Sequence, residues 1–428
     1  MRALADVLNG RGVIVSGSDI RESKNTAELV SSGITVHIGH DPENLGAPDC
    51  VIRTAAAHDD NPEIMAARAN GIPVFERAEA WGAIMREFEN SLCIAGTHGK
   101  TTTTSMAVCI AMADGGDPTV MIGGELPGVG THRVGTDKLI IAEACEYCNS
   151  FLRFAPTVAA ILNVEEDHLD FFSGIEDIIA SFRAFAGLVP EDGAVVVNAD
   201  DKNALVSVEG LDRRVATFGI ENGDVRAKTI EFVNGCAAFD IAHDGGFIPV
   251  KLKVPGKHNI YNALCAAACA LELGIDGVSI ARGLEAFTGA KRRFEYKGEL
   301  NGAQFYDDYA HHPSELAALF SAVENMGYER VISVFQPHTY TRTKALFDDF
   351  ARELRRPDVS LILPIFAARE PDDGSVSSEM LAEKSGARAV SFAEAEAAVR
   401  ELCREGDLVL TIGAGEAYKV AERLCAEI

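Results

Sequence analysis

Short apolar, β-rich runs alternate with helical stretches along the N-terminal part of the chain. The runs that predict strands lie at 13–19, 35–39, 50–54 and 73–75, and the helical stretches lie at 25–32 and 62–70. Such alternation is typical of a parallel sheet whose strands are joined by helices. We expect the first strand, 13–19, to be buried and to end in turn residues. Residues 3–8 predict a helix, although no strand precedes them.

Two further α/β units follow along the chain. One begins with an expected strand at 91–95, and its later strands are expected at 138–142, 158–162 and 194–198. Between 214 and 254, Gly and Asn-Gly turns separate alternating β-branched residues, which predicts a small antiparallel sheet before a helix at 259–273. The last unit has expected strands at 331–335, 361–364 and 407–412. We therefore expect three domains, at 1–89, 90–289 and 290–428.

Composition and charge narrow the class of protein. Of the 428 residues, 47% are apolar and 24% are charged, which excludes an intrinsically disordered chain. The 39 Lys and Arg against 64 Asp and Glu give a formal charge of −25, which argues against nucleic-acid and anionic-membrane partners. An anionic substrate would therefore need a local cluster of cations, backbone N–H groups or metal.

The cysteines and the apolar runs indicate a cytoplasmic protein. No apolar run of the sequence reaches the roughly 18 residues that a membrane helix needs, and the N-terminus shows no signal-peptide core. Ten cysteines without framework spacing fit reduced thiols. Cys145 and Cys148 form one C-x-x-C pair, but a zinc site would want four ligands, so we do not expect zinc there.

A glycine-rich segment lies between the expected strand 91–95 and a helix. Its pattern, Gly96-x-x-Gly99-Lys100-Thr101, is two residues shorter than the usual phosphate-loop motif. Glycines let backbone N–H groups approach phosphates, and the helix N-terminus adds positive potential. Lys100 would hold the terminal phosphates, and Thr101 would bind Mg²⁺ through its hydroxyl. The alternative is an ordinary strand–helix turn with a surface lysine.

This segment and five others, in the same order along the chain, resemble the motifs of the Mur ligases. The six segments are 96–102, 163–170, 256–263, 292–295, 307–313 and 335–343. The resemblance covers nearly the whole chain, and six ordered motifs are far more specific than any single one. It implies an α/β protein of three domains: a Rossmann-like N-terminal domain, a central P-loop ATPase-like domain that carries the small antiparallel sheet, and a Rossmann-like C-terminal domain.

The resemblance also implies an enzyme. Mur ligases use ATP to join an amino acid to a carboxylate, which is first converted to an acyl phosphate and then attacked by the amine. The motifs are most similar to those of members that join L-alanine to the lactyl carboxylate of UDP-N-acetylmuramate in cytoplasmic peptidoglycan precursor synthesis. Such a protein would be a monomer or a weak homodimer. The alternatives are a relative that attaches a whole peptide to the same sugar nucleotide, as in cell-wall recycling, and a UDP-sugar sensor that has lost catalysis.

The family's roles carry over to matching residues. The nucleotide would be bound by Gly96, Thr97, His98, Gly99, Lys100, Thr101, Thr102, His258, Asn259, Asn262, Arg293 and Asp308. Mg²⁺ would be held by Thr101, Glu143 and His168, with Glu146 as the alternative to Glu143. The sugar lactate and L-alanine would meet Tyr309, His311, His338 and Arg342. Catalysis would fall to Lys100, His168, Arg293 and Asp308.

From the residues alone, several of these positions have plainer interpretations. Asn259 would be a helix N-cap. His168 would be a structural histidine, and Glu143 would be a solvated acid at the end of a strand. Arg292, next to Arg293, would be a solvated neighbour.

The start of the chain departs from the family pattern. Mur ligases of this kind begin with a strand and a glycine-rich loop that meets the UDP-sugar, whereas this sequence begins at about the end of that loop. What remains of that site is expected at 16–19, 54–57 and 59–62. A polypeptide that lacks the strand and loop would have an exposed sheet edge and weak binding of the UDP-sugar.

Overall fold

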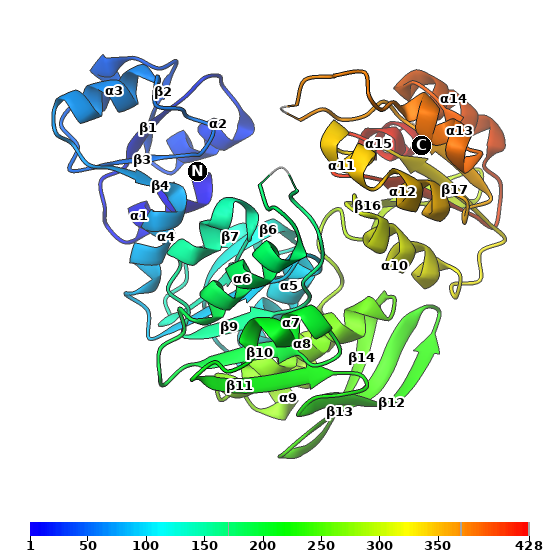
Figure 1. The fold of residues 1–428 in the computed structure, drawn as a ribbon, viewed down its shortest axis with the longest axis horizontal. Helices are drawn as coiled ribbons and strands as arrows, with labels where there is room; N and C mark the ends of the chain where they lie inside the picture. Colours follow the sequence, from blue (N-terminus) through cyan, green and yellow to red (C-terminus); the bar gives the residue numbers. More distant parts are fainter. Residues whose placement is uncertain (170, 369, 427–428) are drawn as a thin grey trace.

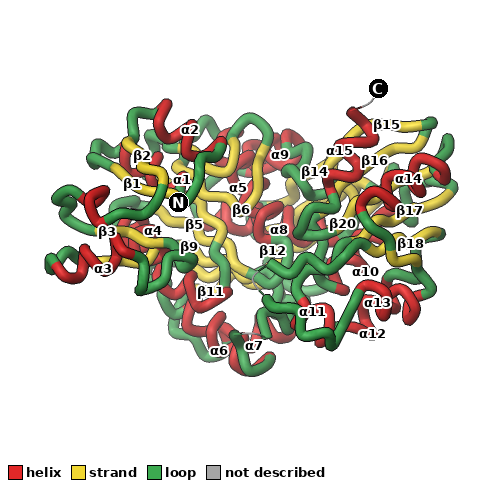
Figure 2. Tube along the Cα trace, turned by 90° about the horizontal axis from the view of Figure 1, so that it is seen from above, coloured by secondary structure: helices red, strands yellow, loops and turns green. Residues whose placement is uncertain are grey.

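Each of the three expected α/β units forms its own sheet structure in the computed structural model (Figure 1). The structure describes residues 1–169, 171–368 and 370–426, so Asp170, at the end of the segment 163–170, lies outside the described residues. Figure 2 shows strands with helices on either side of them, which is the arrangement expected of an α/β protein. None of the helices in the described part of the chain combines the length and apolar character needed to span a bilayer.

The N-terminal part contains two separate two-stranded parallel sheets, β1–β2 and β3–β4. Its elements are α1 (Arg2–Gly10), β1 (Ser16–Asp19), α2 (Lys24–Ser31), β2 (Thr35–Ile38), η1 (Pro42–Leu45), β3 (Val51–Arg53), α3 (Pro62–Ala69), β4 (Val74–Glu76) and α4 (Arg77–Met85). The expectation of a buried strand at 13–19 is wrong. Only Ser16–Asp19 is a strand, most of it is exposed, and Ile14 is fully exposed. Among the described residues, β1 pairs with β2 alone, so this sheet is too small to cover its own apolar residues.

The N-terminal part is attached to the central part through its first and last helices. Leu4 and Val7 of α1 and Trp81 and Met85 of α4 are buried in the same core as residues of the central sheet. His132 of the central part also lies 2.7 Å from a carboxylate oxygen on α1. These two helices therefore fix the N-terminal part in place, and Ile52 of β3 packs against the same core.

The central part is built on a ten-stranded sheet of order β14-β13-β12-β11-β10-β9-β5-β8-β6-β7. Its strands are β5 (Asn90–Ala95), β6 (Thr119–Leu126), β7 (Gly130–Arg133), β8 (Leu139–Glu143), β9 (Val158–Ile161), β10 (Ala194–Asn198), β11 (Arg214–Gly219), β12 (Val225–Val233), β13 (Cys236–His243) and β14 (Gly246–Pro255). The antiparallel strands β12, β13 and β14 form as expected. They are not a separate sheet, because β12 also pairs in parallel with β11 and so extends the main sheet.

Helices cover both faces of this central sheet. They are α5 (Lys100–Ala113), η2 (Tyr147–Arg153), α6 (Ile175–Ala186), α7 (Lys202–Val208), α8 (His258–Glu272) and α9 (Gly277–Ala286). Strand β5 shows the division: Leu92 and Ile94 face the core beneath α5, α8 and α9, while Cys93 and Ala95 face the core beneath α4, α6 and α7. Alternate residues of a strand point to opposite faces, so a strand buried on both sides is apolar throughout.

The C-terminal part has a six-stranded sheet of order β15-β16-β20-β17-β18-β19. Its elements are β15 (Glu295–Leu300), β16 (Ala303–Asp308), α10 (Pro313–Val323), β17 (Arg330–Phe335), α11 (Tyr340–Ala345), α12 (Phe347–Glu353), β18 (Val359–Ile362), α13 (Ser378–Ser385), β19 (Arg388–Ala389), α14 (Phe392–Leu402), β20 (Asp407–Ile412) and α15 (Tyr418–Ala426). Among the described residues of this sheet, only the β15–β16 pair is antiparallel. Helices α14 and α15 cover one face, and α10, α12 and α13 cover the other.

Candidate functional site

The glycine-rich loop, residues 96–101, forms a tight connection between β5 and α5. Gly99 immediately precedes α5 and has a φ of +82°, in the left-handed region that glycine favours. A Cβ at this position would come within 2.5 Å of Asn262 Oδ1 on α8. Asn163 secures the loop, because its Oδ1 accepts from the His98 backbone N–H (2.8 Å) and its Nδ2 donates to the His98 carbonyl (3.1 Å). Asn163 begins the segment 163–170 but is not among the site residues that the sequence predicts.

Lys100, the expected phosphate-binding residue, points back into its own loop. Its Nζ donates to the carbonyls of Gly96 (2.5 Å) and Thr97 (3.0 Å) and contacts both carboxylate oxygens of Glu146 (3.0 and 3.2 Å). Glu146 is only 2% exposed. Burial would lower the pKa of Lys100, but the Glu146 carboxylate raises it above its ordinary value. Lys100 is therefore a largely buried cation whose counter-ion is Glu146.

The three expected metal ligands fall into two neighbouring groups. Thr101 Oγ1 donates to Glu143 Oε2 (2.8 Å), which also accepts from the Gly123 backbone N–H (2.8 Å). The ring of His168 instead has its Nε2 3.8 Å from Glu146 Oε1. The structure thus brings Thr101 and Glu143 together and places His168 beside Glu146. The Thr101 hydroxyl and the carboxylates of Glu143 and Glu146 are oxygen donors of the kind that Mg²⁺ prefers, whereas the imidazole of His168 would be a nitrogen ligand.

A cavity of about 300 Å³ lies beside the glycine-rich loop, between the central and C-terminal parts. The residues expected to bind the nucleotide that line it are His98, Gly99, Thr102, His258, Asn259, Asn262, Arg293 and Asp308. The remaining residues of that expected set, Gly96, Thr97, Lys100 and Thr101, belong to the adjacent loop and do not line the cavity. The volume is at the lower end of the range for small-molecule sites. Residues of two separate sheets therefore meet around one cavity.

The two asparagines of α8 have their amides engaged within the protein. Asn259 Nδ2 donates to the Pro255 carbonyl (2.7 Å), and Asn259 Oδ1 accepts from Asn262 Nδ2 (2.9 Å). Asn262 Oδ1 accepts from the Thr103 hydroxyl of α5 (3.1 Å). Because α8 begins at His258, Asn259 lies inside the helix and is not its N-cap. The asparagines line the cavity and also join α8 to α5.

Arg292 and Arg293 have different surroundings. Arg293 lines the cavity, and its guanidinium lies 5.1 Å from the centroid of the Tyr309 ring. Arg292 is not a solvated neighbour, because its Nε donates to the fully buried Asp307 (3.1 Å) and its guanidinium also contacts the Tyr309 ring at 4.8 Å. The ion pair of Arg292 fixes the backbone from which Arg293 reaches the cavity.

Asp308 holds the same segment from the end of β16. Its Oδ2 accepts from the Phe294 backbone N–H (2.8 Å), and its Oδ1 accepts from the Ala310 backbone N–H (2.8 Å). Burial raises the pKa of Asp308 to about 6, although Arg293 opposes the rise. Asp308 is thus a cavity-lining carboxyl group whose oxygens organise the backbone on both sides of it.

The four residues expected to meet the substrates come together in space. The ring centroids of Tyr309 and His311 are 5.5 Å apart, those of His311 and His338 are 5.9 Å apart, and Arg342 Nη1 lies 3.2 Å from His338 Nδ1. Burial lowers the pKa of His311 and of His338 to about 4, so both rings are neutral near pH 7. Arg342 also reaches the central part, where its Nη2 and Nε contact Asp167 Oδ1 at 2.8 and 3.1 Å. Asp167, which the sequence does not predict as a site residue, precedes His168.

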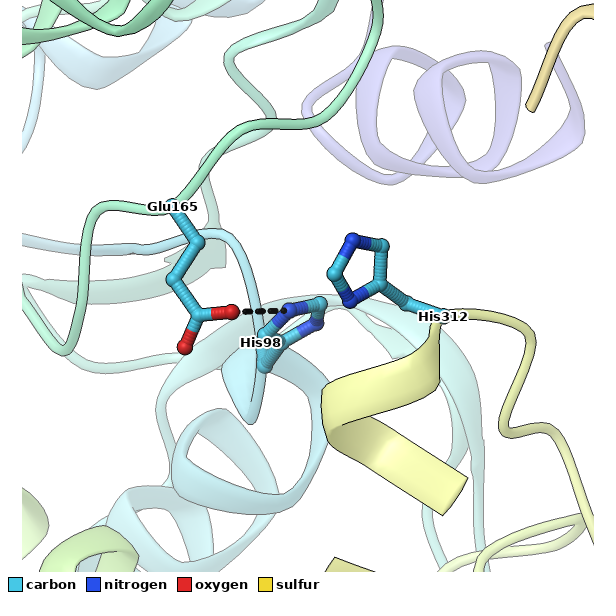
Figure 3. A group of neighbouring side chains, drawn as sticks. All are labelled: His98, Glu165 and His312. Atoms are coloured by element: carbon cyan, nitrogen blue, oxygen red, sulfur yellow. Dashed lines mark ion pairs between the residues drawn. The ribbon is translucent and has the colours of Figure 1, made fainter. Parts of the chain in front are cut away.

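His98 connects the glycine-rich loop to α10 of the C-terminal part. Figure 3 shows its ring between Glu165 and His312. His98 Nε2 lies 3.5 Å from Glu165 Oε2, and on its other side Nδ1 lies 3.1 Å from Glu315 Oε1. Burial would lower the pKa of His98, but Glu315 and Glu165 together raise it to about 10. His98 is therefore a cation held between two carboxylates.

The same neighbours also have a spacing that a metal ion could use. Ligand atoms of His98, Glu165 and His312 lie within 4.8 Å of one another. Both ring nitrogens of His98 are already engaged, Nδ1 with Glu315 and Nε2 with the Ser314 hydroxyl at 3.0 Å. The ion pairs of His98 with Glu165 and Glu315 account for the spacing of its ring from these two carboxylates.

Three family models match successive regions of the chain. Residues 1–89 match the Mur ligase family catalytic domain, residues 94–270 match the Mur ligase middle domain, and residues 292–415 match the glutamate ligase domain of Mur ligases. Together they span all three sheet-forming parts of the fold.

Individual proteins are similar over the full length. The UDP-N-acetylmuramate–L-alanine ligase of Clostridium novyi is 46% identical over 430 residues, which are 99% of this chain and 94% of the relative. The ligase of the same name from Caldanaerobacter subterraneus subsp. tengcongensis is 45% identical over 437 residues, covering 100% and 95%.

Solved structures agree with this similarity. The UDP-N-acetylmuramate–alanine ligase of Thermotoga maritima superposes with a TM-score of 0.82 at 27% identity, covering 100% of this chain and 96% of that one. A murein peptide ligase from Psychrobacter arcticus shares the fold, with a TM-score of 0.73 at 22% identity and coverage of 99% and 95%. With family models over most of its residues and relatives above 40% identity over nearly its whole length, the chain belongs to the Mur ligase family.

Proposed function

We propose that the chain is an ATP-dependent ligase that forms an amide between the lactyl carboxylate of UDP-N-acetylmuramate and L-alanine, in peptidoglycan precursor synthesis. The observation that carries this proposal is the 46% identity, over 99% of the chain, with a ligase of that name. The site supports it, because the glycine-rich loop, the cavity and the group of Tyr309, His311, His338 and Arg342 lie along one boundary between the central and C-terminal parts.

The proposed reaction has two steps. A carboxylate oxygen attacks the γ-phosphorus of ATP, giving an acyl phosphate and ADP. The amine of L-alanine then attacks the carbonyl carbon, the carbon–oxygen bond to phosphate breaks, and phosphate and a proton are released as the amide forms. Lys100 would leave Glu146 to offset the negative charge on the transferring phosphoryl group. Arg293, which reaches the cavity from the C-terminal part, would add a second positive charge.

We propose Thr101, Glu143 and His168 as the residues that hold Mg²⁺. The contact between Thr101 and Glu143 supports the first two, and Glu146, next to His168, would complete the set. When bound, the ion would neutralise charge on the phosphate oxygens. The Thr101 hydroxyl and the Gly123 backbone N–H hold the Glu143 carboxylate in position.

Arg342 is the proposed partner of the L-alanine carboxylate. A guanidinium can bind a carboxylate through two N–H groups, and Arg342 already makes two contacts of this kind with Asp167. The neighbouring neutral rings of His311 and His338 leave Arg342 as the positive charge of that group. An incoming carboxylate would therefore compete with Asp167 for the guanidinium.

The remaining features are proposals of the same kind. We propose domains at 1–89, 90–289 and 290–428, a monomer or weak homodimer, and a cytoplasmic location. All ten cysteines are unpaired, which supports a reducing compartment. Light scattering after size-exclusion chromatography would determine the oligomeric state.

Phosphate release from ATP and UDP-N-acetylmuramate tests the proposal, with L-alanine, other amino acids and a short peptide as separate amines. Release that depends on L-alanine is the expected result. Faster release with the peptide would instead favour a ligase of cell-wall recycling. No release with any amine would contradict the proposal and favour a UDP-sugar sensor.

A further inference from the structure

Glu315 of α10 is not among the residues that the sequence predicts, yet it contacts both sides of the candidate site. We infer that Glu315 is a positioning residue that ties the glycine-rich loop to the backbone of His311 and His312, and so aligns the nucleotide with the acceptor when the central and C-terminal parts meet. The inference rests on the proposed function.

One carboxylate oxygen of Glu315 caps the N-terminus of its own helix, α10. Its Oε2 accepts from the backbone N–H groups of His311 (2.8 Å) and His312 (3.2 Å). Because His312 is the N-cap of α10 and Glu315 is its third residue, this is a capping box. Glutamine performs the same role in such a box, so capping alone does not require a negative charge.

The other oxygen makes a contact that capping does not explain. Glu315 Oε1 lies 3.1 Å from His98 Nδ1, and these residues are 217 positions apart in the chain. His98 lies two residues before Lys100. His311 belongs to the substrate group, which consists of Tyr309, His311, His338 and Arg342. The Glu315 carboxylate therefore contacts both the glycine-rich loop, which would bind the nucleotide, and the backbone of His311, which would meet the substrates.

The surroundings of Glu315 make this contact strong. Its side chain is 13% exposed and lines the cavity. Burial would raise the pKa of Glu315, but the charged His98 and the nearby Arg293 hold it well below the ordinary range, so the carboxylate is charged. Because His98 is also charged, the bond between them is charge-assisted and stronger than a neutral one.

Alignment of this kind affects the chemical step. Phosphoryl transfer needs the carboxylate and the γ-phosphate in line, and a misplacement of about 1 Å can reduce the rate about 100-fold. Loss of the Glu315–His98 contact would leave the loop and the substrate group each intact but free to shift against each other. The expected defect is therefore in kcat, with smaller changes in KM.

Glu315→Gln tests the charge while keeping the cap. A matched control is Glu394→Gln, since Glu394 occupies the same capping-box position on α14 with Ser391 as its N-cap. We expect E315Q to lower kcat by roughly 10-fold or more, the size of one lost charge-assisted hydrogen bond, with the KM for ATP within about threefold of wild type. E394Q should have the kcat of the wild type, and both variants should unfold within a few degrees of each other.

A second variant, His98→Asn, tests whether the effect passes through the contact. If it does, the double variant will be about as slow as the slower single variant, because either change already breaks the same bond. If the factors by which the two single variants lower kcat multiply in the double variant, the inference is overturned. An unchanged kcat in E315Q would also overturn it. So would a melting temperature of E315Q well below that of E394Q, because it would indicate a purely structural role. A wild-type protein that releases no phosphate would reject the proposed function and this inference with it.

Discussion

Gly99 combines two constraints, and Gly99→Ala would violate both. An L-residue with a φ of +82° costs about 1–2 kcal/mol relative to glycine. The new Cβ would also lie 2.5 Å from Asn262 Oδ1, which accepts from the Thr103 hydroxyl. Displacing the Asn262 amide would leave buried polar groups unpaired, at about 1–3 kcal/mol. The total expected destabilisation is about 2–5 kcal/mol.

Gly115→Ala separates the backbone cost of a positive φ from the cost of displacing the Asn262 amide. Gly115 follows the end of the same helix and has a φ of +89°, but a Cβ there would meet nothing within 4 Å. This control should therefore cost only the backbone term of about 1–2 kcal/mol. The difference between the variants measures the close approach of the glycine-rich loop to α8.

Calorimetric unfolding and ADP titration are the assays. One kcal/mol shifts the melting temperature of a domain of this size by about 2–4 °C, so G99A should melt about 4–20 °C lower and G115A about 2–8 °C lower. G99A should also lose ADP binding, which G115A should keep. Equal melting temperatures, together with normal ADP binding by G99A, would refute the tight packing of the loop against α8.

Three other predictions concern the metal, the amine and pH. Glu143→Gln should raise the Mg²⁺ concentration for half-maximal phosphate release by roughly 10-fold or more, because a charged oxygen ligand is lost; an unchanged Mg²⁺ titration would instead favour Glu146 as the ligand. Arg342→Lys should raise the KM for L-alanine about 10-fold and leave the KM for ATP unchanged, since lysine cannot make the two-point contact; steady-state kinetics that show no difference would contradict this role. The pKa of His338 falls to about 4 on folding, so its stabilising contribution is fully present above pH 6.5 and is lost as the pH falls through 4. This contribution is about 3 kcal/mol. In urea titrations between pH 6.5 and 4, the unfolding free energy of His338→Gln should therefore fall less steeply than that of the wild type. Equal slopes would count against the burial of the His338 ring.

The sequence predicts elements best where the signal is local. Strands β10 and β20 have the expected bounds, 194–198 and 407–412, because both are apolar runs buried on two faces. The expected buried strand at 13–19 fails because burial depends on what covers the strand, which its own residues do not encode. Likewise, alternating residues between 214 and 254 predict antiparallel pairing, but not that β12 joins the main sheet through β11.

The site shows the same limit. Motif residues such as Lys100 and Arg342 are found from sequence because their chemical types and spacing are distinctive. That Glu146 and Asp167 are their counter-ions becomes apparent only from contacts between segments far apart in the chain, although the sequence already offers Glu146 as an alternative metal ligand. The sequence gives a weak signal for Asp167, because this residue lies in the segment 163–170. It gives no such signal for Glu315, because Glu315 lies just beyond the segment 307–313.

The two small sheets of the N-terminal part have a consequence for substrate binding. Two-stranded sheets are marginally stable by themselves, so amide hydrogens of β1–β4 should exchange through local opening while those of the central strands require global unfolding. Trp81, the one tryptophan of the chain, is 1% exposed on α4 and would stay docked during such opening. A ligand that binds only the ordered form loses apparent affinity in proportion to the fraction open. Affinity for a sugar nucleotide at this part of the molecule would thus include the free energy of ordering it.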